Sequence, residues 1–238
     1  MTHQQRWDCM ENDLQKCEVR RILDRYLIEV VEQFWLCPWA RAARENGEVA
    51  IDIILGSAKT ARRGQYGDEG LAAETEERAL AAGAALLALP TTKIGIVVVV
   101  DAQCDRIALR ELRTKATAAQ KIAGVADFHP DAEPDFATPA RLVSFIRRAP
   151  DPFLQFVPFA VIDGVRGGVQ SVDRAAQIAL LANKGNLVGV PAPKQDIADV
   201  IAARNHERLA PDRGAEMLAV LDDINADRER SYVRVGLL

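Results

Sequence analysis

A cysteine and a proline stand between two tryptophans in the segment FWLCPWARAA, residues 34–43. The segment joins two stretches with helical spacing, so Cys37 is predicted to end the first helix and Pro38 to open the second. At such a position the backbone N–H groups and the helix dipole favour a thiolate, the nucleophilic form of cysteine. The sequence therefore predicts either a reactive thiol at Cys37, assisted by Arg41, or a small side chain buried between the tryptophans.

A histidine with nearby carboxylates stands before another proline, in the segment VADFHPDAEPD at 125–135. The segment is predicted to begin as a strand, so Asp127 and His129 share one face. Pro130 ends the strand and leaves His129 at its carboxyl end, where open sheets with parallel strands usually bind ligands. His129 could act as a general base oriented by Asp127, with Asp131 in reach of the substrate. The alternative is a structural histidine bonded to the backbone.

A basic residue ends the predicted helix that precedes the segment APDP. Arg148 could anchor an anionic substrate, or it could simply oppose the dipole of its helix. If the three proline-terminated segments meet at one rim of the sheet, Cys37, His129 and Arg148 supply a thiolate, a base and an anion anchor. That set is typical of a hydrolase or transferase that uses covalent thiol chemistry.

The elements that must position these residues alternate between strand and helix patterns. Strands are predicted at 49–55, 93–100, 125–130 and 153–162, and helices at 18–34, 68–89, 105–123, 139–148, 171–184, 195–209 and 212–225. The alternation favours βαβ units, while the short connection before the fourth strand and Pro158 favour an antiparallel edge strand. We expect an α/β fold, with mixed α+β as the alternative, in which helices pack on a mixed sheet of about four strands as a two-layer sandwich.

The chain divides into three predicted regions. Residues 1–17 form a loose polar lead-in, residues 18–165 an α/β core domain, and residues 166–238 a helical C-terminal extension packed on that core. The glycine-rich stretch at 56–70 could in principle hold a phosphate, but the acidic residues at its end would repel that anion. A mobile loop is therefore the favoured prediction.

Composition narrows the classes of partner. The 238 residues carry a formal net charge of −4, and 49% of them are hydrophobic, which is typical of a globular protein without nucleic-acid affinity. We expect a cytoplasmic protein, since no apolar run is long enough to span a membrane and no signal peptide is evident. A homo-oligomer is one option. The four cysteines have no metal-binding or disulfide spacing. The sequence therefore identifies no cofactor, and a divalent metal is one option.

Three segments together resemble a bacterial family catalogued as domain of unknown function 1415. The matching residues are Leu36, Cys37, Pro38 and Ala40 in an L-C-P-F-A pattern, Phe128, His129, Pro130 and Asp131 in F-H-P-D, Arg148, Pro150 and Pro152 in N-R-S-P-Y-P, and Arg204 and Asn205 in a helical R-N pair. Trp39, Arg41 and Ala149 depart from the usual Phe, Lys and Ser of the family. The resemblance implies candidate site residues but no reaction.

The sequence leaves three functions open. The first is an enzyme that acts on a small anionic metabolite, with Cys37, His129 and Asp127 as catalytic residues and with Arg148, Arg41 and Asp131 as substrate-binding residues. The second is a non-catalytic module at the same rim that binds a small ligand or a protein. The third is a metal-dependent enzyme with cysteine, histidine and aspartate ligands.

Overall fold

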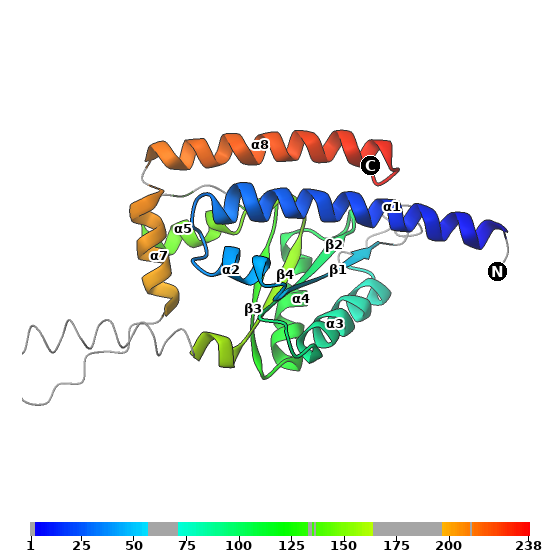
Figure 1. Ribbon diagram of the computed structural model, residues 1–238, viewed down its shortest axis with the longest axis horizontal. Coiled ribbons are helices and arrows are strands. Elements are labelled where there is room, and N and C mark those ends of the chain that lie inside the picture. Colours follow the sequence, from blue (N-terminus) through cyan, green and yellow to red (C-terminus); the bar gives the residue numbers. More distant parts are fainter. Residues whose placement is uncertain (1–2, 57–70, 133–134, 136, 164–196, 210) are drawn as a thin grey trace, which may run out of the picture.

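A four-stranded mixed sheet with helices on both faces forms the body of the chain (Figure 1). The structure is a computed structural model, which describes residues 3–56, 71–132, 135, 137–163, 197–209 and 211–238. The strands are β1 (Val49–Leu55), β2 (Ile94–Val100), β3 (Ala123–Phe128) and β4 (Phe153–Pro158). The helices are α1 (His3–Arg25), the π-helix η1 (Tyr26–Glu32), α2 (Ala40–Glu45), α3 (Ala73–Ala88), α4 (Arg106–Ala119), α5 (Pro139–Ile146), α7 (Ile197–Arg208) and α8 (Pro211–Arg234). The mixed α/β class and the four-stranded mixed sheet are confirmed.

The strand order is β1-β2-β4-β3, which places the fourth strand inside the sheet. β1 and β2 are parallel, and β4 is antiparallel to both β2 and β3. The fourth strand is antiparallel as predicted, but its predicted place at the edge is wrong. Pro158 is the last residue of β4 and pairs with Ala123, the first residue of β3, so its missing N–H falls where the ladder ends.

The helices form two layers, so the molecule has three layers and the predicted two-layer sandwich is wrong. The crossover helices α3 and α4 share one apolar core with one face of the sheet. The other face packs against α1, η1, α5 and α8 in a second core. β2 shows the reason, because its side chains alternate between the two cores, with Val97 facing the first and Ile96 and Val98 the second.

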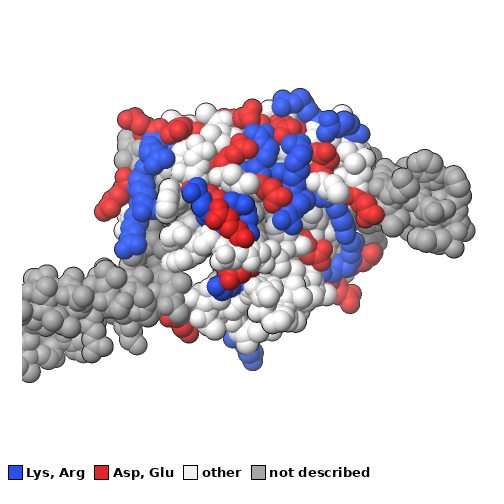
Figure 2. All heavy atoms as spheres, viewed as in Figure 1, with Lys and Arg blue, Asp and Glu red and all other residues white. Residues whose placement is uncertain are grey.

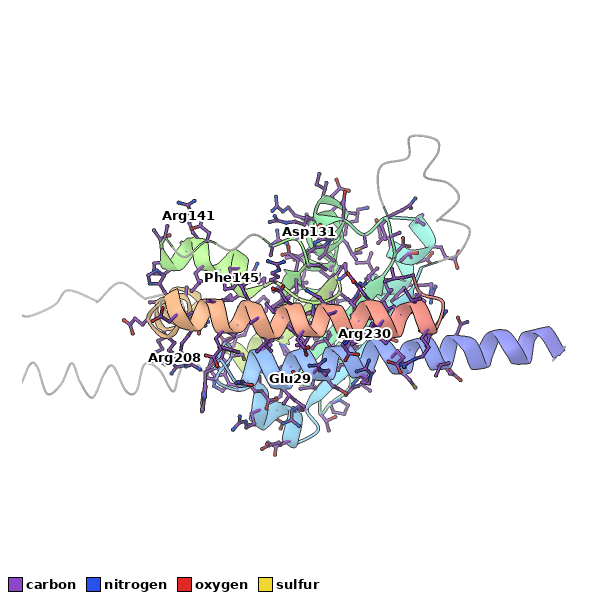
Figure 3. The ribbon with its side chains drawn as sticks, turned by 90° about the horizontal axis from the view of Figure 1, so that it is seen from above. Glu29, Asp131, Arg141, Phe145, Arg208 and Arg230 are labelled. Carbon is purple, nitrogen blue, oxygen red and sulfur yellow. The ribbon has the colours of Figure 1, made fainter. Side chains whose placement is uncertain are left out.

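The segments before β1 and after β4 cover the same face of the sheet. The chain is helical from His3 to Arg25, so the lead-in expected at 1–17 is helix rather than loose chain from residue 3 onward. The described part of 166–238 consists of α7 and α8, and α8 lies alongside α1 (Figures 1 and 3). Asp227 of α8 bonds to Arg21 at 2.7 Å and to Arg25 at 2.8 Å, which ties these two helices together.

A buried carboxylate joins α8 to the start of β4. The side chain of Asp151 accepts hydrogen bonds from the hydroxyl of Tyr232 at 2.5 Å and from Nε of Arg228 at 2.7 Å. Burial raises the pKa of Asp151 and outweighs the opposing effect of Arg228. The guanidinium of Arg228 also lies 4.4 Å from the centre of the Tyr232 ring. The described C-terminal helix is therefore fixed to the sheet by one polar cluster.

Some sequence expectations fall outside the described residues. These are residues 57–70 of the glycine-rich stretch and the helix at 171–184. Among the described helices, none combines the length and the apolar character needed to cross a membrane.

Candidate functional site

A cavity of about 770 Å³ lies between the sheet and the elements η1, α2, α5 and α7. Its floor includes Ile96 of β2, Gln155 of β4 and Ala126 of β3, which stand in one row because Gln155 pairs with both of the others. Figure 2 shows charged side chains gathered over α1 and α8, with further charged atoms near α2, whose sequence ARAARE contains two arginines and a glutamate. The volume is typical of pockets that enclose a small molecule, about 300–1,000 Å³.

Aromatic rings form part of the cavity wall. Phe128 and Phe153 stack with their centroids 4.4 Å apart, and Tyr26 meets Phe153 edge-on at 6.1 Å. The hydroxyl of Tyr26 is fully buried, and no group in the described part of the chain bonds to it. Burial raises the pKa of Tyr26, so this hydroxyl stays protonated at neutral pH. These three side chains give the cavity apolar ring surface and one unbonded hydroxyl.

Gln155 places an amide in the middle of the apolar floor. Its neighbours on the same strand face, Phe153 and Val157, are apolar and also line the cavity. The side-chain amide is partly exposed and has no hydrogen-bond partner among the described residues. Gln155 was not predicted as a site residue, although one polar residue inside the apolar run FLQFVP is a usable signal.

The segment around Cys37 forms a turn rather than a helix cap. The N–H of Ala40 bonds to the carbonyl of Cys37 at 3.3 Å, with Pro38 at the second position, where proline is favoured. The following helix begins at Ala40 and is preceded by Trp39. The prediction that Cys37 caps this helix and that Pro38 opens it is therefore wrong.

Cys37 does line the cavity, but as a poorly ionised thiol. Burial raises the pKa of Cys37 above that of an ordinary thiol, and the N–H groups of Trp39 and Ala40 offset only part of this effect. The predicted shift toward thiolate is wrong because loss of solvation exceeds the stabilisation that those N–H groups provide. The alternative, a small side chain buried between the two tryptophans, holds only in part, because Cys37 is partly buried while Trp35 and Trp39 are both exposed.

We expect Cys37 to react slowly with iodoacetamide, at least several-fold more slowly than the exposed Cys17. Because burial raises its pKa, the thiolate fraction and the alkylation rate should still increase as the pH passes 9.0. Peptide mass spectrometry over a pH series measures both rates in one sample. A Cys37 rate that levels off near neutral pH would instead indicate the lowered pKa expected from the sequence.

Helix α7 bonds to the backbone just before the turn formed by residues 37–40. The amide of Asn205, which is 2% exposed, donates to the carbonyl of Leu36 at 3.1 Å. Arg208, labelled in Figure 3, donates to the carbonyl of Trp35 at 3.4 Å and lies over the Trp35 ring. Trp35 has a positive φ of 55°, a conformation that a large side chain adopts only where the surroundings enforce it. Asn205 is thus a structural support for the site.

The predicted binding residue Arg41 neutralises a buried acid. Glu32 ends η1, and its side chain is only 2% exposed. Arg44 bonds to it at 2.6 Å and Arg41 at 3.3 Å, and the bond from Arg44 is the main reason why the pKa of Glu32 is lowered. Glu32 and Arg44 line the cavity, while Arg41 lies outside its lining residues.

His129 lies outside the cavity lining, and its ring bonds to the backbone. Nε2 lies 3.0 Å from the carbonyl of Cys104, and Nδ1 accepts the N–H of Asp131 at 3.1 Å. This pattern places the proton of a neutral ring on Nε2. The arrangement is that of the strand-end structural histidine considered above, and it leaves neither ring nitrogen directed at Cys37.

The two predicted acidic partners do not join a catalytic group with Cys37. Asp127 forms ion pairs with Arg113 at 3.3 Å and with Arg147 at 3.7 Å. The side chain of Asp131 is 76% exposed. Figure 3 shows Asp131 on the opposite side of α8 from Glu29 of η1. All three proline-terminated segments contribute residues to the cavity, but of Cys37, His129 and Arg148 only Cys37 lines it, so the predicted thiolate, base and anion anchor do not meet there.

The predicted anion anchor Arg148 is also absent from the cavity lining, whereas its neighbour Arg147 is present. Nε of Arg148 is buried and unbonded within the described chain. The start of the helix before both residues was predicted correctly, with Thr138 as its cap accepting the N–H of Arg141 at 3.3 Å, but the helix ends at Ile146 rather than at residue 148. The sequence thus identified the basic pair but not which member faces the cavity.

Within the described ranges, no three His, Cys, Asp or Glu side chains come together in a group that could hold a metal ion. No family model matches the sequence, and the comparisons with curated proteins and with solved structures also find no match. Membership of the family that the three segments resemble therefore stays a prediction.

Proposed function

We propose that this protein binds a small, largely apolar molecule in the cavity over β2, β4 and β3. The observation that carries the proposal is the row formed by Ile96, Gln155 and Ala126, in which one unbonded amide stands on an apolar floor. Ligand pockets are commonly built in this way, with apolar walls and a few polar groups that fix the orientation of the ligand.

The positions of Cys37 and His129 support a binding role better than they support catalysis by a thiol. A nucleophilic cysteine needs a base within hydrogen-bond reach, and both nitrogens of His129 are engaged by the backbone. Cys37 contributes an apolar wall instead. We place this binding role in the cytoplasm, since Cys17, Cys37 and Cys104 are all free thiols.

The proposal is tested with N-phenylnaphthylamine, a neutral dye that fluoresces in apolar surroundings. The dye should bind with saturation at one site per chain, and dodecanol should displace it. Gln155→Leu should weaken displacement by dodecanol about fivefold, because the alcohol loses a hydrogen bond of about 1 kcal/mol.

Gln33→Leu is the matched control for this experiment, because Gln33 is exposed and lies outside the cavity lining. Its affinity for dodecanol should equal that of the wild type. Failure of the dye to saturate would overturn the proposal. Equal affinity in the two leucine variants would remove Gln155 from the site.

A further inference from the structure

The charged side chains that line the cavity do not balance one another. Two acid–base pairs are complete: Glu32 with Arg44 at 2.6 Å, and Glu48 with Lys93 at 2.7 Å. Arg147 is the fifth charged residue of the lining. Its one ion pair among the described residues is the contact of 3.7 Å with Asp127, outside the lining. The cavity wall therefore keeps one positive charge that its own acids do not neutralise.

The guanidinium of Arg147 makes no hydrogen bond within the described part of the chain, although its side chain is only 38% exposed. Asp127 compensates it incompletely, because this carboxylate is closer to Arg113, at 3.3 Å. Arginine stays charged in proteins and carries five N–H donors in a planar fork. A partly buried cation with free donors is a strong attractor for a planar anion such as a carboxylate.

The backbone holds Arg147 firmly at this position. Its carbonyl accepts the N–H of His129 at 3.1 Å, which joins the end of α5 to the end of β3. Phe128, the last residue of β3, and Ile146, the last residue of α5, line the cavity on either side of this link. Arg147 thus lines the same cavity as the apolar floor, next in sequence to one apolar lining residue and joined by its backbone to the end of β3.

We infer that the ligand of the proposed cavity is an amphipathic carboxylate, with its apolar body over Ile96 and Ala126 and its carboxylate on Arg147. The inference rests on the proposed function and adds the chemical class of the ligand.

Displacement of bound N-phenylnaphthylamine by dodecanoate and by dodecanol tests the inference, since the two competitors share one chain and differ in the head group. Both are used below the concentration at which they form micelles. In the wild type, dodecanoate should bind about tenfold more tightly than dodecanol, because a charged hydrogen-bonded pair is gained at a partly exposed site. Arg147→Gln should remove this preference and leave dodecanol unaffected.

Arg110→Gln is the charge-matched control, since Arg110 is an exposed residue of α4 on the opposite face of the sheet. It should keep the preference for dodecanoate. Equal binding of the two competitors to the wild type, or an unchanged preference in Arg147→Gln, would overturn the inference while leaving the cavity proposal intact. If the dye itself fails to bind, it is the proposed function that fails.

Discussion

The substitution Ala126→Trp should weaken binding of the neutral dye N-phenylnaphthylamine to the cavity by roughly thirtyfold or more, equivalent to about 2 kcal/mol. Ala126 is a small residue on the cavity floor, beside Gln155. An indole there occupies the space above the amide and displaces the apolar body of any ligand. The strand should tolerate the change, because aromatic residues favour strands and this position faces open volume. Dye titration measures the loss, and circular dichroism checks the fold.

The control for this prediction is Ile122→Trp. Ile122 lies just before β3 and is 62% exposed, so an indole at this position adds the same bulk outside the cavity. Dye affinity should match that of the wild type. If Ala126→Trp binds the dye as tightly as the control does, the dye occupies another site.

Replacing Asp151 by alanine should lower the free energy of unfolding by about 3 kcal/mol. The substitution leaves Arg228 and the hydroxyl of Tyr232 without their common partner, and Asp151 is 3% exposed. An orphaned buried group costs far more than a lost surface contact, because solvent cannot replace the missing bond. Urea denaturation followed by circular dichroism measures the change.

Two further variants keep this prediction testable if Asp151→Ala does not fold. Tyr232→Phe removes one hydrogen bond and should cost about 1 kcal/mol. Asp24→Ala breaks an ion pair with Arg20 in which both side chains are at least 40% exposed, and it should cost less than about 1 kcal/mol. A loss for Asp151→Ala no larger than that for Asp24→Ala would show that the cluster does not hold α8 in place.

The sequence predicted the elements well where local patterns decide them. β1 was predicted at its observed bounds, and the Thr138 cap of α5 was also correct. The position of β4 was not predictable in the same way. The connection from β2 to β3 leaves a gap of one strand between them in the sheet, β4 fills that gap, and no local pattern in the sequence shows this. The two-layer expectation failed for a related reason, since no local pattern shows that both crossover helices pack on the same face.

The site was harder to predict because it depends on burial and on neighbours distant in sequence. Cys37 was predicted at the start of a helix, but it lies in a turn before α2, and desolvation by packing raises the pKa of its thiol. His129 was placed correctly at the end of a strand, but the carbonyl that it meets belongs to Cys104. Arg147 and Arg148 are indistinguishable in sequence, and only the geometry at the end of α5 decides which of them lines the cavity.

The π-helix η1 is a further feature that the sequence pattern did not reveal. Its apolar spacing fits an α-helix, but the N–H of Gln33 bonds to the carbonyl of Ile28, five residues back, at 3.2 Å. Such wide turns are rare and often lie at functional sites. Here η1 supplies Tyr26 and Glu32 to the cavity wall, which agrees with a binding role for this face.

Photolabelling with a neutral aliphatic diazirine alcohol tests the central claim most directly, because it shows where on the chain an apolar ligand sits. Mass spectrometry should find adducts at 36–43, which spans the turn after Leu36 and the start of α2, and on β4 at 153–157. Excess dodecanol should abolish these adducts. The same adducts should be missing from Ala126→Trp. Adducts confined to exposed side chains such as Ile107, or adducts that dodecanol does not reduce, would contradict a binding cavity over the sheet.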